Sequence, residues 1–367
     1  MNKARVIAFY LPQYHPIPEN DKYWGKGFTE WTNVAKAKPL FRGHYQPHIP
    51  ADLGFYDLRL PEVREAQAEL ARDAGIEGFC YYHYWFGNGK MLLQKPFEEV
   101  LRLGKPDFPF CLCWANHDWT TKTWVKGSSM VNNTMIAQQE YLGEQDDIKH
   151  FEYCLRAFKD HRYITIEGKP IFLIYDPLSF PNVKEFMNRW NFLAKKNNLK
   201  GIYFIGVTTG RQSSYKIVTN LGFDGVCHNR RWEAEAKAAG FRFVRRMQSL
   251  LGWHLGISLM KYDYNKVVRN YDTPENKLEN CYPVITPGFD RTPRAGRRAG
   301  IYVNSSPKNF KKHVAEVCKS IQDKDDDHRL VFLSAWNEWG EGNYMEPDLK
   351  WGHGYFCLLY TSPSPRD

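Results

Sequence analysis

Eight short apolar runs recur along the whole chain and constrain its fold more than any other feature of the sequence. They occupy residues 6–10, 78–82, 110–114, 171–175, 203–207, 225–227, 282–285 and 330–335. Because they are apolar at nearly every position, they are typical of strands covered on both faces. Stretches with helical hydrophobic periodicity separate several of them, most clearly residues 61–74, 181–197 and 306–321. Strand and helix therefore alternate along the chain.

This alternation predicts an α/β fold, a single-domain (β/α)8 or TIM barrel with long loops after its strands. A doubly wound sheet is the alternative, but the chain has no G-x-G-x-x-G after its first strand and no G-x-x-x-x-G-K-[ST] phosphate loop. Because no linker divides the chain, residues 1–355 are expected to form the barrel. Residues 356–367 contain Ser-Pro-Ser-Pro, which cannot continue a helix, so we expect a truncated or foreign tail there.

The composition points to a cyclic or planar ligand. Aromatic residues make up 16% of the chain, with 12 Trp and 22 Tyr, and rings with polar tips stack against sugars or nucleobases. The formal net charge of +9 permits anionic partners without requiring any. Since no nucleic-acid-binding module is recognisable, we expect no nucleic-acid partner.

The sequence shows no targeting signal and no membrane segment. The first apolar stretch ends at Pro12, too early for a signal peptide, and no run approaches the roughly 20 apolar residues of a transmembrane helix. The eight cysteines form no C-x-x-C pair and most lie in apolar runs, as reduced core residues do. We therefore expect a cytoplasmic protein; its oligomeric state stays open.

Polar and aromatic residues gather directly after the apolar runs. In a (β/α)8 barrel the carboxyl ends of the strands carry the chemistry, so these residues are the candidates for substrate binding. The first half of the chain supplies Tyr10, Gln13, His15, His83, Tyr84, Trp85, Trp114, Asn116, Asp118 and Trp119. Glu30 and Trp31 join them from a long aromatic loop that we expect over the barrel mouth, with simple loop packing as the alternative. The second half supplies Tyr175, Asp290, Trp336, Asn337 and Trp339.

Glu338 and Glu341 are the candidate catalytic residues. Two carboxyl groups among tryptophans at one strand end are the parts that glycosidic bond cleavage needs. A general acid at pH 7 needs a pKa raised from about 4.3 toward 6 or 7, and burial against neighbouring rings can supply that shift. Gly340 and Gly342 allow sharp turns that aim both side chains into one cavity. The alternative is a loop whose glutamates face water.

Neither a metal ion nor another cofactor is expected. The chain has no H-E-x-x-H motif, and scattered histidines at strand ends more often hydrogen-bond ligands. Arg291, Arg294, Arg297 and Arg298 follow the seventh run and can bind a phosphate or a uronate. A solvated basic loop is the alternative for these arginines.

Six ordered segments resemble the WbsX-like family, also described as glycoside hydrolase family 99-like. They span the chain from about residue 4 to 355, which makes chance agreement very rare. The segments are FYLPQYHP at 9–16, WGKGFTEW at 24–31, GHYQP at 43–47, GFCYYHYWF at 78–86, FPFCLCWAN at 108–116 and WNEWGEG at 336–342.

The resemblance implies a (β/α)8 barrel enzyme, an association with bacterial surface-polysaccharide and lipopolysaccharide gene clusters, and a glycan substrate. It also implies a likeness to retaining endo-acting α-mannosidases and mannanases. By that likeness, Glu338 would deprotonate the sugar 2-hydroxyl so that it attacks the anomeric carbon, forming a 1,2-anhydro intermediate. Glu341 would serve as general acid and then as general base.

Two alternatives stay open beside this hydrolase-like reading. Members of the family are also labelled glycosyltransferases, and a fold alone does not choose between transfer to water and transfer to another sugar. A non-catalytic glycan-binding protein is the other alternative. The chain also departs from the family at Asn116-His117-Asp118-Trp119, where the resemblance leads us to expect Asn-Glu-Asn-Trp. A third carboxylate is thereby shortened and shifted.

Overall fold

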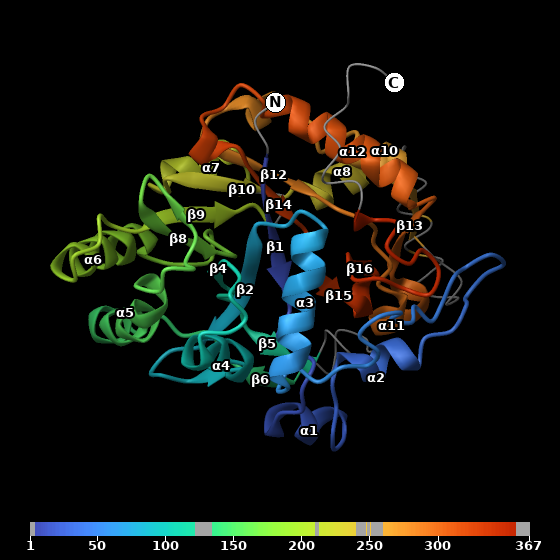
Figure 1. Ribbon diagram of the computed structural model, residues 1–367, viewed down its shortest axis with the longest axis horizontal. Helices are drawn as coiled ribbons and strands as arrows, with labels where there is room; N and C mark the ends of the chain where they lie inside the picture. The colour runs from blue at the N-terminus through green and yellow to red at the C-terminus, as the bar shows by residue number, and fades with distance from the viewer. Residues whose placement is uncertain are drawn as a thin grey trace.

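The computed structural model describes residues 4–121, 134–209, 213–239, 247, 250 and 260–356. Its centre is a closed barrel of eight parallel strands (Figure 1). The strand β1 (Arg5–Tyr10) pairs with β14 (Leu330–Leu333) on one side and with β2 (Gly78–Trp85) on the other, which closes the sheet. From β2 the order continues through β4 (Phe110–Trp114), β8 (Lys169–Ile174), β9 (Tyr203–Val207), β10 (Gly225–His228) and β12 (Cys281–Ile285) to β14. The predicted (β/α)8 barrel is confirmed.

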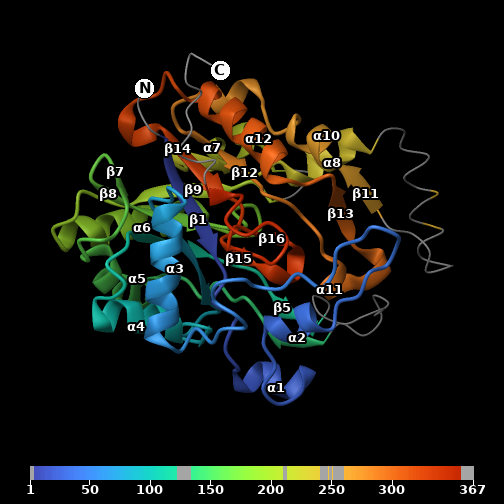
Figure 2. The ribbon, with the colours of Figure 1, turned by 45° about the vertical axis from the view of Figure 1, so that its right-hand side comes forward.

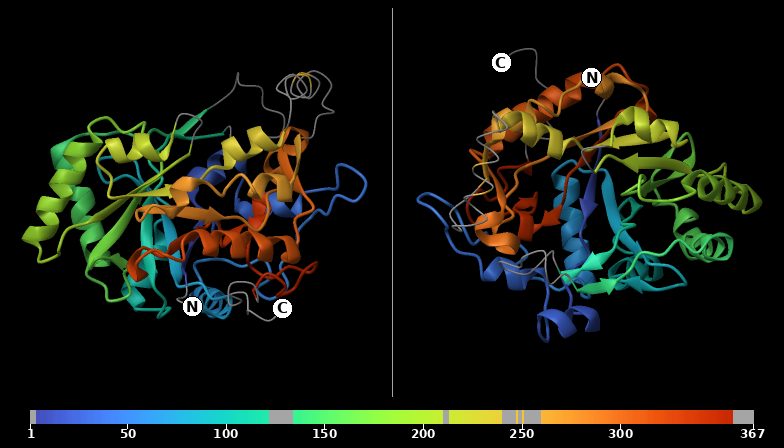
Figure 3. Two further views of the ribbon diagram at one scale, coloured as in Figure 1. Left: turned by 90° about the horizontal axis from the view of Figure 1, so that it is seen from above. Right: turned by 180° about the vertical axis from the view of Figure 1, so that it is seen from behind.

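Helices lie around the outside of the strands (Figure 3). The helix at 61–74, the one at 181–197 and the one at 306–321 are all present, and α12 begins where Ser306 accepts a hydrogen bond from the Asn309 amide with Pro307 in the first turn. The main helices are α3 (Pro61–Asp73), α4 (Lys95–Leu103), α5 (Glu144–Phe158), α6 (Val183–Lys196), α7 (Tyr215–Asn220), α8 (Arg231–Ala238), α10 (Tyr264–Val268) and α12 (Pro307–Ser320). None of them is long and apolar enough to cross a membrane, nor is any other helix among the described residues.

Long loops with short elements of their own follow several strands. The loop after β1 carries α1 (Pro18–Trp24) and α2 (Glu30–Ala35), and the loop after β12 carries α11 (Thr292–Ala295). After β14 the chain forms β15 (Asn337–Glu338), η6 (Trp339–Glu341) and β16 (Asn343–Tyr344). The turn η6, which follows β15, packs against both α2 and α11, and these two helices also contact each other (Figure 2). The other short elements are β3 (Met91–Leu92), β5 (Trp119–Thr120), β6 (Met135–Ala137), β7 (Thr165–Ile166), β11 (Met260–Asp263), η3 (Pro274–Lys277), η4 (Gly296–Arg298), β13 (Gly300–Val303) and η5 (Asp326–His328).

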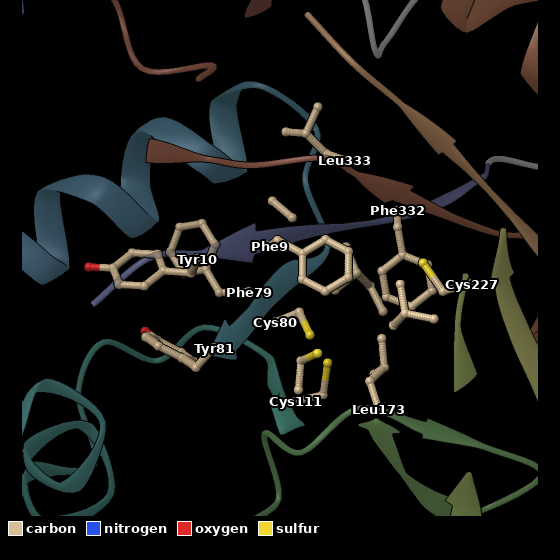
Figure 4. Close-up of a cluster of buried hydrophobic side chains, with 14 of the residues drawn as sticks. Phe9, Tyr10, Phe79, Cys80, Tyr81, Cys111, Leu173, Cys227, Phe332 and Leu333 are labelled. Carbon is tan, nitrogen blue, oxygen red and sulfur yellow. The ribbon is translucent and has the colours of Figure 1, made fainter. Parts of the chain in front are cut away.

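Successive side chains of each strand point alternately into the barrel and toward the surrounding helices. Phe9 faces the interior, where its ring stacks on Phe332 at 5.4 Å (Figure 4). The next residue, Tyr10, points outward and packs against Phe79 and Tyr81 (Figure 4). This alternation decides which of the residues after each strand reach the mouth of the barrel.

The cysteines that the structure describes are unpaired. Residues 357–367, most of the expected tail, lie outside the described residues, and Phe356 packs against the indole ring of Trp336.

Candidate active site

Glu338 and Glu341 lie together after the carboxyl end of β14, where the carboxyl group of Glu341 is close enough to perturb the pKa of Glu338. Burial and the adjacent charge of Glu341 raise the pKa of Glu338. Burial alone would also raise the pKa of Glu341, but Arg294, Arg291 and Arg231 outweigh it and hold that pKa well below its usual range. At neutral pH the pair therefore holds one proton, on Glu338, while Glu341 is ionised.

Arg294 of α11 joins Glu341 to Glu30, the first residue of α2. Its Nη1 lies 2.5 Å from Glu341 Oε1, and its Nε and Nη2 each donate to one carboxylate oxygen of Glu30 at 2.9 Å. Glu30 is fully buried and Arg294 is 5% exposed, so this two-pronged contact is a charge-assisted pair with little solvent screening. Arg291 approaches the same Glu341 oxygen at 3.3 Å, and Arg231 lies 3.9 Å from the other oxygen. Three arginines, from the segments after β10 and β12, thus converge on the Glu341 carboxylate.

Gly340 makes this convergence sterically feasible. A Cβ atom built on Gly340 would lie 1.8 Å from Glu30 Oε1 and 3.1 Å from Arg294 Nε. Gly342 has a φ of +56°, the left-handed region that favours glycine. The two glycines expected to shape the turn thus have separate physical reasons, close approach for one and backbone conformation for the other.

Three tyrosines lie beside Glu338 at the mouth of the barrel. They are Tyr82 and Tyr84 of β2 and Tyr175, which directly follows β8. Burial raises the pKa of each hydroxyl, and the charge of Glu338 contributes to all three shifts. The rings of Tyr82 and Tyr175 meet edge to face at 5.9 Å, and Tyr84 stacks on Trp119 at 5.6 Å. This aromatic wall offers ring faces on which a sugar can stack.

Several predicted binding residues point away from the mouth. Side chains alternate along a strand, and these residues occupy the positions that face the surrounding helices. His83 and Trp85 face α5, where His83 Nε2 lies 2.8 Å from His150 Nε2 and Trp85 Nε1 donates to Asp146 at 3.1 Å. The indole of Trp114 packs edge to face on the His150 ring at 4.7 Å. These three residues belong to the packing between the barrel and α5.

Tyr10 and Trp336 also lie in the packing outside the barrel. Tyr10 donates a hydrogen bond from its hydroxyl to Gln67 of α3 at 2.6 Å. Trp336 is fully buried between Phe79 and Phe356. Both residues pack outside the barrel strands, on the side away from the barrel interior.

Three predicted polar residues hold the loops at the barrel mouth to one another. Asn337 accepts from the Leu11 amide at 2.8 Å and donates to the Leu11 carbonyl at 3.0 Å, which ties the loop after β14 to the loop after β1. The side chain of Asn116 likewise donates one hydrogen bond to the backbone of the loop after β8 and accepts another from it. The carboxylate of Asp290 accepts from His44 Nε2 at 2.7 Å and is largely enclosed by protein groups. Their contacts support the site by fixing its loops.

The remaining predicted residues surround this core of the site. Trp31 and Trp339 pack on each other at 5.6 Å. The backbone carbonyl of Gln13 accepts from the first amide of α2 at 3.2 Å. Burial lowers the pKa of His15 to about 4. Asp118 is exposed and accepts a hydrogen bond from a backbone amide in the loop before α5 at 2.8 Å.

Glu346 is a residue of this site that the sequence analysis missed. Its carboxylate lies under η6 and accepts hydrogen bonds from Tyr56 at 2.9 Å, Gln67 at 2.6 Å and Trp339 at 2.5 Å. Burial nevertheless raises its pKa to about 7. Arg231 was missed too, because no motif marks it. The arginine-rich stretch after the seventh run predicts either a phosphate or uronate site or a solvated loop, and the structure instead places its Arg291 and Arg294 against Glu341.

One group of described residues has donor atoms close enough to hold a metal ion: His83, His150 and Cys154, all buried. It lies between β2 and α5, and the two imidazoles already satisfy each other through their hydrogen bond. The site at Glu338 is separate from this group.

The architecture defines a (β/α)8 barrel, and similar solved structures share this fold. One similar solved structure is the glycoside hydrolase family 99 endo-α-mannosidase from Bacteroides thetaiotaomicron in complex with bis-tris propane. It is 16% identical with a TM-score of 0.55, over 95% of this chain and 88% of that one. Another, described as a glycoside hydrolase-like protein, is 15% identical with a TM-score of 0.60, over 98% and 93% of the two chains.

Residues 6–359 match the model of the family described as glycosyltransferase WbsX, and the chain belongs to this family. Two curated relatives are the uncharacterized proteins WxcX of Xanthomonas campestris pv. campestris, strains B100 and ATCC 33913, each 34% identical over 353 residues. The match covers 96% of this chain but 48% of theirs, so the chain spans about half the length of these relatives. The resemblance inferred from the six motifs is confirmed.

Proposed function

We propose that this protein acts on glycosidic bonds of a bacterial surface polysaccharide or its precursor, as a retaining, glycoside hydrolase-like enzyme whose catalytic pair is Glu338 and Glu341. The observation that carries this proposal is the opposite pKa shift of two carboxyl groups that lie three residues apart on one turn and are electrostatically coupled. Acid–base cleavage of a glycosidic bond requires one protonated and one ionised carboxyl group at the same place. Family membership and the aromatic wall support a glycan as the substrate.

The charges around the pair favour Glu338 as the proton donor to the leaving oxygen. Glu341 is ionised beside three arginines and has no proton to give in the free protein. The resemblance implies the reverse order, with Glu341 as the acid. That order requires a bound glycan to draw Arg294 away from Glu341, so that its pKa rises. We therefore assign the resting proton to Glu338 and the ionised role, base or nucleophile, to Glu341.

Leaving-group dependence tests this assignment. The substrates are 2,4-dinitrophenyl glycosides from a panel of hexoses, compared with the matching methyl glycosides. A dinitrophenolate leaves without protonation, so Glu338→Gln should keep most activity on the dinitrophenyl glycoside and lose it on the methyl glycoside. Glu341→Gln should lose activity on both. The opposite pattern would show that Glu341 is the acid, and unchanged turnover in both variants would refute the catalytic pair.

Glycosyl transfer is the second candidate function, and the arginines beside the pair are the observation that favours it. Arg231, Arg291 and Arg294 can hold the diphosphate of a nucleotide- or lipid-linked sugar donor. Incubation with bacterial polysaccharides, with and without such donors, distinguishes the two activities by mass spectrometry. Hydrolysis releases shorter glycans without a donor, whereas transfer extends the acceptor only when a donor is present. A purely glycan-binding protein would form neither product and would keep its affinity after both glutamates are replaced.

The proposal places this activity in the cytoplasm and in one domain formed by residues 1–355. Limited proteolysis tests the second point, because a single domain should resist cleavage between its strands.

A further inference from the structure

A pocket lies next to the turn that carries the carboxylate pair. Its volume is about 320 Å³, within the range of pockets that hold small ligands. Its walls come from residues 41–48 in the loop before α3, from residues 287–305 around β13, and from residues 342–355 after η6. Three loops that are distant in the sequence build it.

The pocket lies on the other side of the turn that carries Glu341. The amide of Asp290 donates to the Glu341 carbonyl at 2.5 Å, and both Asp290 and Gly342 line the pocket. The Glu341 side chain points instead toward Arg294. The pocket therefore lies beside the carboxylate pair without including it, because neither Glu338 nor Glu341 is among the lining residues.

Aromatic rings dominate the opening of the pocket. Tyr45 and Trp351 flank the ammonium group of Lys350, which lies 4.8 Å from one ring centre and 4.7 Å from the other. Trp351 is 36% exposed. Partly exposed rings at the edge of a cavity are suited to stack on the apolar face of a sugar ring.

The two carboxylates that line the pocket are held by hydrogen bonds from other protein groups. Asp348 accepts from the Tyr344 hydroxyl at 2.6 Å and from the Trp351 amide at 2.6 Å. Asp290 accepts from His44, as described above. Both carboxylates are buried and accept hydrogen bonds from protein groups. The exposed charged groups near the pocket are cationic: Lys350 beside its two rings, and Lys261 over Phe41, a residue of the pocket wall.

We propose that this pocket binds one sugar ring of a glycan, with a preference for a ring that carries a carboxylate. The rings at the opening stack on the sugar, and Lys350 pairs with the carboxylate. This binding is independent of catalysis at Glu338 and Glu341. In a polysaccharide-active enzyme it would hold a second part of the polymer next to the reacting bond.

Saturation-transfer NMR with methyl β-D-glucuronide and methyl β-D-glucoside, each at millimolar concentration, tests the proposal on the whole protein. The glucuronide should bind more tightly than the glucoside. Trp351→Ala should weaken glucuronide binding about tenfold, the loss expected for one stacking contact. Lys350→Glu should abolish the preference for the acid. Phe192→Ala, which removes an exposed ring of α6, is the matched control and should change nothing.

Binding should persist in the double variant Glu338→Gln/Glu341→Gln, and this result separates the pocket from the catalytic proposal. Loss of binding in that double variant would place the ligand at the carboxylate pair and overturn the inference. No glucuronide binding, equal binding of both sugars, or binding that survives Trp351→Ala and Lys350→Glu unchanged would also overturn it.

Discussion

Replacing Arg294 by Met removes a guanidinium that hydrogen-bonds to the carboxylates of both Glu30 and Glu341. Methionine keeps much of the side-chain length, so the main loss is charge and three donated hydrogen bonds. Breaking a buried ion pair by removing one partner costs about 3–5 kcal/mol, because the other charge stays buried without compensation. Glu30, with 0% of its surface exposed, cannot regain solvent without opening the loop. We expect the free energy of unfolding to fall by about that amount at pH 8.

The loss of unfolding free energy in Arg294→Met should depend on pH in a defined direction. Burial already raises the pKa of Glu30, and Arg294 opposes this shift. Without the arginine the folded-state pKa rises further above the unfolded value, so the folded state binds more protons than the unfolded state between the two values. Stability then falls as pH rises through this window and returns as pH falls toward about 4.3, the unfolded value.

Urea unfolding at pH 5 and pH 8, followed by tryptophan fluorescence, measures both effects. The double variant Arg294→Met/Glu30→Gln should recover part of the loss at pH 8, because the buried charge of Glu30 is then removed while Glu341 keeps Arg291 and Arg231. A loss below about 1 kcal/mol for Arg294→Met at pH 8 would mean that the pair is screened like a surface ion pair. A loss that is the same at both pH values would refute the linkage argument.

Three further predictions follow from the same geometry. Because the pKa of Glu338 is raised, turnover of methyl glycosides should fall as pH increases past that pKa and the proton is lost; a rate profile that rises there instead would contradict the assigned acid. Gly340→Ala should destabilise the protein by about 1–3 kcal/mol or more, because the new Cβ would collide with Glu30 Oε1. Gly300→Ala is the control: its Cβ would make only ordinary van der Waals contacts, so its melting temperature should stay within a few degrees of the wild type. Glu346→Gln should lower the free energy of unfolding by about 1–3 kcal/mol, because the new amide NH2 group would face one of the buried donors that the carboxylate now accepts from. Urea titration at pH 8 can detect this loss, and an unchanged midpoint would show that these hydrogen bonds are dispensable.

The sequence by itself determined the barrel and the place of its chemistry. A strand buried on both faces must be apolar along its length, which is a local property that the residues display directly. All eight predicted runs coincide with barrel strands, from β1 to β14. Parallel strands end on one side, so the residues after them had to lie at one face, as Glu30, Glu338 and Glu341 do.

Only the tertiary structure decided which strand-end residues face the mouth and which carboxyl group is ionised. A shift of one position sends a side chain to the opposite side of the sheet, so Tyr84 lies beside Glu338 while His83 is buried against α5. The charges on the pair depend on Arg231, Arg291 and Arg294, which loops after other strands bring within 4 Å of Glu341. Electrostatic interaction depends on distance in space and on burial, and neither is written in the order of the residues along the chain.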